Sequence, residues 1–189
     1  MGEERQPMRG VWQKHYCLPR LFFPTSTFLE LKLTGLQGDV MKESMNVAKT
    51  LAWNLTSSKN KKHWINVFNE NKCQGLHIHC PEGAVSKDGP SAGAAITTAI
   101  YSLLNDKKIP NNIAVTGEIN LQGEITAIGG LDYKIIGGIK AGVKKFFFPE
   151  ANERDYMQFM NDNKKHIDID IKFIKINNIN QLLKEISLI

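Results

Sequence analysis

Residues 81–94 read Pro-Glu-Gly-Ala-Val-Ser-Lys-Asp-Gly-Pro-Ser-Ala-Gly-Ala, and this stretch sets the main expectation for the fold. Gly89 can adopt backbone angles that other residues avoid, and Pro90 suits the first position of a helix, where an N–H would have no partner. The apolar run that follows predicts a helix from Pro90 to about Leu104. Ser91 is therefore expected in the first turn of a buried helix.

The first turn of a helix carries backbone N–H groups without helical partners, at the positive end of the helix dipole. Such donors can stabilise the oxyanion of an acyl transfer, so Ser91 is a candidate nucleophile. An ordinary cap before an Ala-rich helix explains the segment equally well. A nucleophilic serine also needs a base. His77 and His79 offer a serine–histidine pair and Lys134 a serine–lysine pair, and the pattern alone does not choose.

Lys134 could act as a base only if its amine were largely neutral. An ordinary lysine is charged at pH 7, and lowering its pKa to about 7 costs about 4 kcal/mol. Burial in an apolar wall has this effect, and Tyr133, Ile135 and Ile136 are apolar neighbours in sequence. A lysine on a helix is otherwise solvated.

Strand and helix patterns alternate along the rest of the chain. Alternation with a period of two predicts strands, apolar spacings of three and four predict helices, and Ser57–Lys62 is interpreted as a polar linker. The intermixed order indicates an α+β (mixed α/β) class, with helices packed on small β-sheets. The predicted strands are 28–33, 74–80, 113–116, 123–128, 145–148 and 169–176, and the predicted helices are 40–55, 90–104, 131–141, 152–160 and 179–188.

Composition restricts the function classes. The 189 residues are 42% hydrophobic, enough for one domain with a core, and no apolar run approaches the roughly 18 residues that a membrane span needs. The net charge is +5, but Lys59, Lys61 and Lys62 lie in the predicted linker and not in a groove with stacking aromatics, so no nucleic-acid partner is expected. Three cysteines without a CxxC motif predict free thiols in a reducing compartment.

Five segments together resemble the Lon protease family, in the family's order and spacing, over about residues 28–189. The resemblance implies the Lon proteolytic-domain fold for residues 27–189 and leaves residues 1–26 as an atypical N-terminal extension. The matching segments are Thr34–Ser44, His77–Ala84, Lys87–Gly93, Thr116–Ile119 and Ile128–Leu131, the last leading to Lys134.

The resemblance implies a role for each matching position. Ser91 matches the family's nucleophile, and Lys134 matches the general base that later returns the proton to the leaving amine. Thr116 matches a threonine placed to hydrogen-bond that lysine. The remaining matches, expected to support the site without taking part in the chemistry, are Asp88, His77, His79, Glu43 and Glu118.

The implied function is that of the serine endopeptidase domain of an ATP-dependent Lon-type protease, which degrades unfolded or damaged proteins as a homohexameric ring. No Gly-x4-Gly-Lys-Ser/Thr occurs, so the AAA+ ATPase module is absent from this sequence, and ATP and Mg are expected only for that module. No cofactor, metal or membrane contact is expected here. The domain alone should be weakly active or latent. The family and the free cysteines indicate the mitochondrial matrix, with the bacterial cytoplasm as the alternative.

Two departures from the family bear on substrate binding. Ser86 stands where many members have proline, and residues 1–26 lack the family's β-rich lead-in with its Gly-Leu-Ala-aromatic-Thr stretch.

Three other readings compete. His77-x-His79 with Glu82 or Asp88 could hold a metal ion in a metallohydrolase. Ser58-x-x-Lys61 matches the motif of penicillin-recognising enzymes, but without the partner motifs of that class. The altered N-terminus would also fit a non-enzymatic adaptor.

Overall fold

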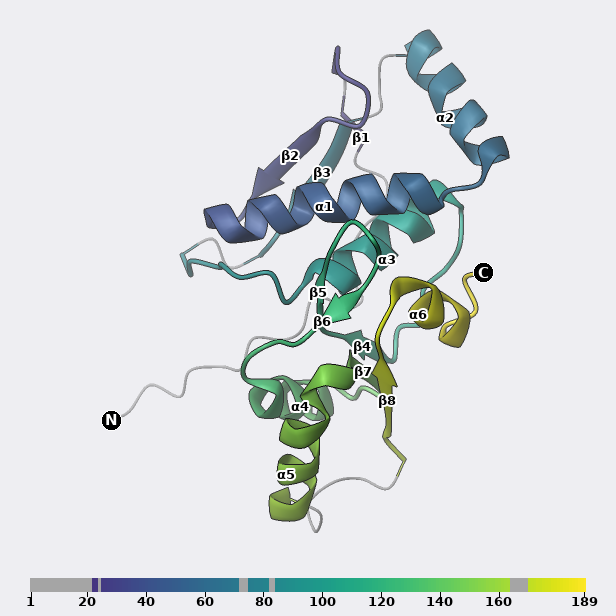
Figure 1. The fold of residues 1–189 in the computed structure, drawn as a ribbon. Helices are drawn as coiled ribbons and strands as arrows, with labels where there is room; N and C mark the ends of the chain where they lie inside the picture. Colours follow the sequence, from purple (N-terminus) through teal and green to yellow (C-terminus); the bar gives the residue numbers. More distant parts are fainter. Residues whose placement is uncertain (1–21, 24, 72–74, 82–83, 164–169) are drawn as a thin grey trace.

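The computed structural model describes residues 22–23, 25–71, 75–81, 84–163 and 170–189, and shows helices packed on small sheets (Figure 1). The predicted α+β class is confirmed. Most of the predicted extension 1–26 lies outside the described residues. The helices are α1 (Asp39–Leu55), α2 (Ser58–Asn71), α3 (Gly93–Leu104), α4 (Leu131–Lys140), η1 (Glu150–Asn152, 3-10), α5 (Glu153–Asn163) and α6 (Ile179–Glu185). The strands are β1 (Phe22–Phe23), β2 (Leu31–Thr34), β3 (Gly75–His79), β4 (Ile113–Val115), β5 (Glu118–Ile119), β6 (Ile125–Thr126), β7 (Lys145–Pro149) and β8 (Lys172–Ile176).

The first sheet has β3 in its centre, with β2 parallel on one side and β1 antiparallel on the other. The alternation predicted around β3 is confirmed, because Leu76 and Cys80 are buried whereas His79 is exposed. The long helix α1 runs beneath this sheet in Figure 1 and packs along α3.

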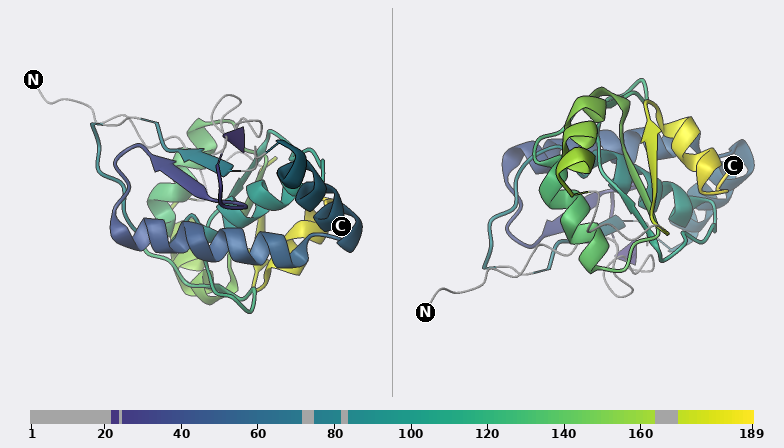
Figure 2. Two further views of the ribbon diagram at one scale, coloured as in Figure 1. Left: turned by 90° about the horizontal axis from the view of Figure 1, so that it is seen from above. Right: turned by 90° about the horizontal axis from the view of Figure 1, so that it is seen from below.

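The second sheet consists of β4, β7 and β8, all parallel, with β7 in the centre. Because side chains alternate along a strand, Phe147 faces one side of this sheet and Phe146 and Phe148 face the other. Phe147 belongs to the larger hydrophobic cluster, which α1, α3 and α6 also line. Phe146 and Phe148 belong to a smaller cluster with α4 and α5. Figure 2 shows α4 and α5 on one side of β8 and α6 on the other.

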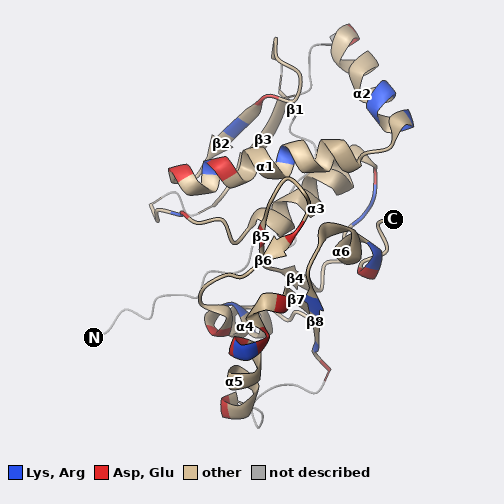
Figure 3. Ribbon diagram, in the orientation of Figure 1, with Lys and Arg blue, Asp and Glu red and all other residues tan. Residues whose placement is uncertain are grey.

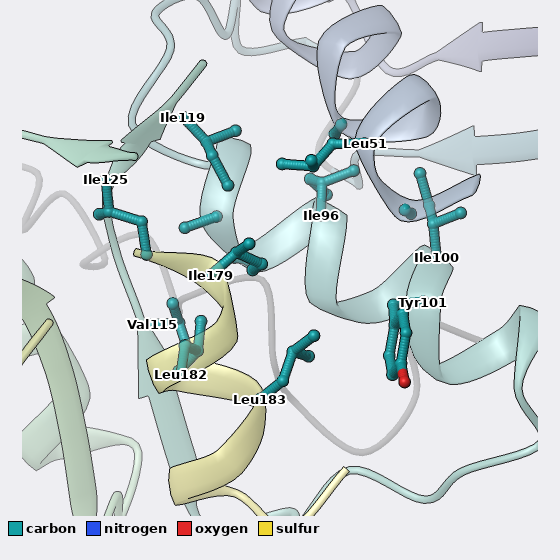
Figure 4. Packing of buried hydrophobic residues seen from close by; sticks show 14 of the residues in the cluster. Leu51, Ile96, Ile100, Tyr101, Val115, Ile119, Ile125, Ile179, Leu182 and Leu183 are labelled. Carbon is teal, nitrogen blue, oxygen red and sulfur yellow. The ribbon is translucent and has the colours of Figure 1, made fainter. Parts of the chain in front are cut away.

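Helix α3 is the centre of the larger cluster. Nearly every one of its residues is buried, as expected for a helix that is apolar all round. In Figure 4 its Ile96 lies against Leu51 of α1, while Leu182 and Leu183 of α6 lie on the other side, with Leu182 beside Val115 of β4. The turn that precedes α3 is thus attached to the most buried element. In the described residues, no helix is long and apolar enough to cross a membrane.

The predicted linker Ser57–Lys62 is wrong, because α2 begins at Ser58. The side-chain oxygen of Ser57 accepts from the amide of Asn60 at 3.3 Å, and its carbonyl accepts from Lys61, so Ser57 caps this helix. Trp64 then donates its indole N–H to the carbonyl of Leu104, at the end of α3. The basic start of α2, blue in Figure 3, is therefore part of a packed helix.

Two predicted strands need correction. The strand predicted at 28–33 begins only at Leu31, because Leu29 has φ of 52° within a turn closed by the Glu30 amide on Thr27. The strand predicted at 123–128 is the short β6, which pairs with β5, and β5 was not predicted. The turn predicted near Asn120–Gly123 is confirmed, since the Asn120 side chain accepts from two amides there.

Candidate active site

Ser91 lies in a tight turn immediately before α3. The amide of Gly93 donates to the carbonyl of Pro90 at 3.0 Å and closes this turn. The helix begins at Gly93, with Ala92 as its N-cap, so the predicted start at Pro90 and the placement of Ser91 in the first helical turn are wrong. The reason is tertiary: the Ser91 carbonyl accepts from the amide of Gly117 at 2.9 Å, a residue far along the chain. The Ser91 side chain is half-buried.

The segment Thr116–Gly117, directly after β4, holds this turn in place. Besides the Gly117 amide, the Thr116 hydroxyl donates to the Ser91 carbonyl at 3.2 Å. In return, the amide of Ala94 donates to the Gly117 carbonyl at 3.0 Å. Thr116 was expected to hydrogen-bond Lys134, but its hydroxyl donates to the Ser91 carbonyl. The amides of Gly93 and Ala94, at the observed start of α3, both donate to backbone carbonyls, so neither is free to bind an oxyanion.

Lys134 comes from the first turns of α4. Gly130 precedes this helix in the left-handed region, with φ of 64°, which favours glycine. The chain then places Lys134 so that its Nζ donates to Ser91 Oγ at 3.2 Å. The two side chains come from elements on opposite faces of the β4–β7–β8 sheet, yet they meet at hydrogen-bonding distance. Of the two pairs that the sequence left open, the structure brings together serine and lysine.

The environment of Lys134 favours a neutral amine. Burial lowers the pKa of Lys134, and no ion pair to this ammonium is present in the part of the chain that the structure describes. Of the predicted apolar neighbours, Ile135 is buried, but Tyr133 is 77% exposed and Ile136 37% exposed. Adjacent residues on a helix point in different directions. The prediction that Tyr133 and Ile136 would bury the Lys134 amine is therefore wrong.

Asp88 connects the segment before Ser91 to helix α1. Its carboxylate accepts from the amide of Met41 at 2.9 Å, in the first turn of α1, and from the amide of Gly89. The N-cap of α1 is Gly38, which has no capping side chain of its own. A Cβ at Gly38 would lie 2.4 Å from the Asp88 carboxyl carbon. Glycine at this position therefore leaves room for the Asp88 side chain to cap α1. Asp88 thus stabilises the loop that leads to the nucleophile.

The two predicted histidines share one hydrogen-bond partner, Thr34 on the neighbouring strand. The Thr34 hydroxyl lies 2.9 Å from His77 Nε2 and 2.8 Å from His79 Nδ1, across the β2–β3 pair. Burial, helped by the charges of Lys32 and His79, lowers the pKa of His77 and favours its neutral form. The histidines therefore belong to a polar network on the first sheet.

Within the described ranges, no hydrogen bond or ion pair joins either of the two predicted glutamates to Ser91 or Lys134. Glu43 on α1 and Glu118 on β5 are both exposed. No group of three His, Cys, Asp or Glu that could hold a metal ion occurs within the described ranges, and Glu82 lies outside them. The competing metal site thus gains no support from the described residues.

The sequence did not reveal two contacts of the nucleophile turn. The Gly117 amide donates to the Ser91 carbonyl while the Gly117 carbonyl accepts from the amide of Ala94, and the Ser44 hydroxyl of α1 donates to the Pro90 carbonyl at 3.4 Å. A glycine directly after a predicted strand was the available signal for Gly117. A Cβ there would lie 2.4 Å from Ile125 Cγ2, which explains the glycine.

Comparison with known proteins identifies a family for this chain. Residues 23–188 match the model of the Lon protease (S16) C-terminal proteolytic domain. A Lon protease of Metamycoplasma arthritidis is 42% identical over 195 aligned residues, covering 98% of this chain and 22% of that protein. A Lon protease of Clostridium acetobutylicum is 42% identical, over 82% of this chain and 19% of that protein. A mitochondrial Lon protease homolog of Phaeodactylum tricornutum is 41% identical, over 74% and 15%. The chain thus spans about a fifth of the length of the curated relatives that it matches.

Proposed function

The chain belongs to the Lon protease family, as a C-terminal proteolytic domain with serine endopeptidase character, and from that premise we propose that Ser91 and Lys134 form its catalytic dyad. The observation that carries the proposal is the 3.2 Å contact between Lys134 Nζ and Ser91 Oγ, with the amine half-buried and without an ion pair within the described ranges.

The proposed reaction begins with a neutral Lys134. Its amine takes the proton of the Ser91 hydroxyl while the Ser91 oxygen attacks the carbonyl carbon of the scissile peptide bond. The tetrahedral intermediate then collapses, and the Lys134 ammonium gives its proton to the leaving amine nitrogen. Water, deprotonated by the same amine, releases the acyl group. The lowered pKa of Lys134 supports this cycle, since burial makes the neutral base accessible nearer neutral pH.

The remaining parts of the function are proposals about a larger protein. We propose that the substrates are unfolded or damaged proteins and that the domain works within a homohexameric ring. ATP and Mg would act at a separate AAA+ module, since the sequence has no Gly-x4-Gly-Lys-Ser/Thr to hold a nucleotide phosphate. Two of the three relatives described above are bacterial and one is named mitochondrial. We therefore favour the bacterial cytoplasm over the mitochondrial matrix.

The test is hydrolysis of a short unstructured peptide, measured with and without ATP. Ser91→Ala and Lys134→Ala should each lower kcat/KM by at least about 10²-fold, because each removes a partner in the proton transfer. Lys140→Ala is the matched control, since Lys140 is an exposed lysine on the same helix. Full activity of either dyad variant, with folding intact, would refute the dyad. An inactive wild-type chain that still binds protein partners would favour the adaptor reading instead.

A further inference from the structure

The two glycines that lead into α4 supply no side chains to hold its start. Lys134 is the fourth residue of this helix, and the two residues before the helix are Gly129 and Gly130. Gly130 makes no side-chain cap bond, and a Cβ at Gly129 would meet nothing within 4 Å. This pair of glycines can neither pack against the protein nor cap the helix. The place where α4 begins therefore depends on the buried side chains of Ile128 and Leu131, on either side of the glycines, and on what binds the Ile128 backbone.

Asn152, in the connection between β7 and α5, binds that backbone. Its Oδ1 accepts from the amide of Ile128 at 2.9 Å, and its Nδ2 donates to the carbonyl of Ile128 at 2.8 Å. One side-chain amide thus binds both polar groups of one backbone residue, in the way that a neighbouring strand would. Ile128 immediately precedes the two glycines, so this is the last fixed backbone before α4.

Three hydrogen bonds fix the orientation of the Asn152 side-chain amide. It is only 3% exposed, at the end of η1, and its Nδ2 also donates to Asp155 Oδ2 at 2.7 Å. Because the nitrogen has two acceptors and the oxygen has one donor, all three bonds agree on a single orientation of the amide. Helix α5, which Asn152 precedes, packs against α4. The amide therefore ties the start of α4 to the element that supports it.

We infer that Asn152 is a positioning residue for the proteolytic reaction, which places the amine of Lys134 against Ser91 Oγ by fixing the backbone of Ile128. This inference rests on the proposed dyad. Loss of the two hydrogen bonds from Asn152 to Ile128 would let the first turn of α4 shift, and water could then reach the Lys134 amine. Displacement of a catalytic group by about 1 Å costs on the order of 10²-fold in rate. Added hydration would also favour the charged form of Lys134, because burial is what lowers its pKa.

The experiment compares Asn152→Ala with a matched asparagine variant elsewhere. Asn105→Ala is the control, since Asn105 also donates to a backbone carbonyl, that of Tyr101, but at the far end of α3 from Ser91. The readouts are kcat and KM for a short peptide, the pH dependence of kcat/KM, and the pKa of Lys134 followed by NMR of labelled lysine. Asn152→Asp, which keeps the acceptor for the Ile128 amide but loses the donor to its carbonyl, carries the same test if the alanine variant does not fold.

Asn152→Ala should lower kcat by about 10- to 10²-fold with little change in KM, and should move the acidic limb of the pH profile to higher pH. The NMR pKa of Lys134 should rise with it. Asn105→Ala should change stability alone. If Asn152→Ala lowers activity only in proportion to the folded fraction, with the limb and the Lys134 pKa unmoved, the inference is overturned. The NMR titration needs no turnover, so it tests Asn152 even if Ser91→Ala shows that the dyad itself is wrong.

Discussion

Ser91 precedes α3, a helix that is buried on nearly every side. Lys134 lies on α4, which covers the opposite face of the β4–β7–β8 sheet. We call the Ser91 turn, α3 and the segment Thr116–Gly117 the nucleophile region. The segment Ile128–Gly130, α4 and α5 form the base region. In the nucleophile region the turn around Ser91 is held by three backbone-to-backbone hydrogen bonds, of Gly93 to Pro90, Gly117 to Ser91 and Ala94 to Gly117, together with the Thr116 hydroxyl. In the base region the corresponding contacts come from one side chain, Asn152.

This difference fits the two chemical requirements. A nucleophile has to stay at a fixed point on the substrate path, and backbone bonds between distant segments give that fixation whatever the side chains are. A lysine base needs a partly dry environment, which depends on how closely its helix sits against the rest of the molecule. The nucleophile region should therefore be most sensitive to backbone crowding. The base region should be most sensitive to polar side chains and to the charge of Lys134.

The largest effect on stability is expected from a methyl group at Gly117. Gly117→Ala places a Cβ 2.4 Å from Ile125 Cγ2, in the segment that bonds to Ser91. Overpacking of this kind costs about 1–3 kcal/mol, and the shift should also lower peptidase activity. Gly129→Ala is the control in the base region, where a Cβ meets nothing within 4 Å, and should stay within about 0.5 kcal/mol of wild type. Urea unfolding measures both. Equal losses in the two variants would contradict the contrast between the regions.

A smaller effect is expected from the cap that Asp88 provides to α1. Asp88→Ala removes the acceptor of the Met41 amide, and loss of an N-terminal cap costs about 0.5–2 kcal/mol. Asp88→Asn keeps an oxygen at that place and should lose less than half as much. Thermal unfolding of the two variants gives the comparison. A large loss of turnover in Asp88→Asn at unchanged stability would show instead that the carboxylate takes part in the chemistry.

Local patterns predicted most of the helices. Helix α4 was predicted from Leu131 with Gly142 at its end, and Gly142 has the positive φ, 75°, of a C-terminal glycine. Helix α2 was missed because its start depends on Ser57 as a cap, and its polar sequence gave no strong period. The strand β5 is only two residues long and is defined by its pairing with β6. No periodicity extends over two residues.

Contacts between distant segments could not be predicted from the residues around them. The start of α3 was placed too early because the amide of Gly117 takes the Ser91 carbonyl that a helical amide would otherwise use. Thr116 was assigned to Lys134, but its hydroxyl donates to the Ser91 backbone. Asp88 and Met41 are 47 residues apart, and the sequence alone offered no reason to join them. The positions named for the site were thus informative, but their partners depend on the fold.

The smallest expected effect on stability comes from removing the charge of Lys134. Most mutations destabilise a protein, whereas this one is expected to stabilise it. Because burial lowers the pKa of Lys134 in the folded chain, the unfolded chain binds a proton that the folded chain does not, between the folded pKa and the ordinary value of 10.5. Stability therefore rises with pH across this window, and at neutral pH the buried amine destabilises the fold. Lys134→Met should abolish turnover yet stabilise the domain, at the low end of the roughly 0.5–2 kcal/mol that a single stabilising substitution commonly gives.

The pH dependence separates this cause from simple packing. The gain of Lys134→Met over wild type should be present at pH 7 and should shrink as the pH approaches 10.5, where the folded and the unfolded states of the wild type both lose the proton. Lys140→Met, on the exposed side of the same helix, controls for the helix propensity of methionine. Urea unfolding at the two pH values decides the matter. A gain that is equal at both would mean that methionine packs better, whereas a loss at pH 7 would mean that the amine is not held away from water in the base region.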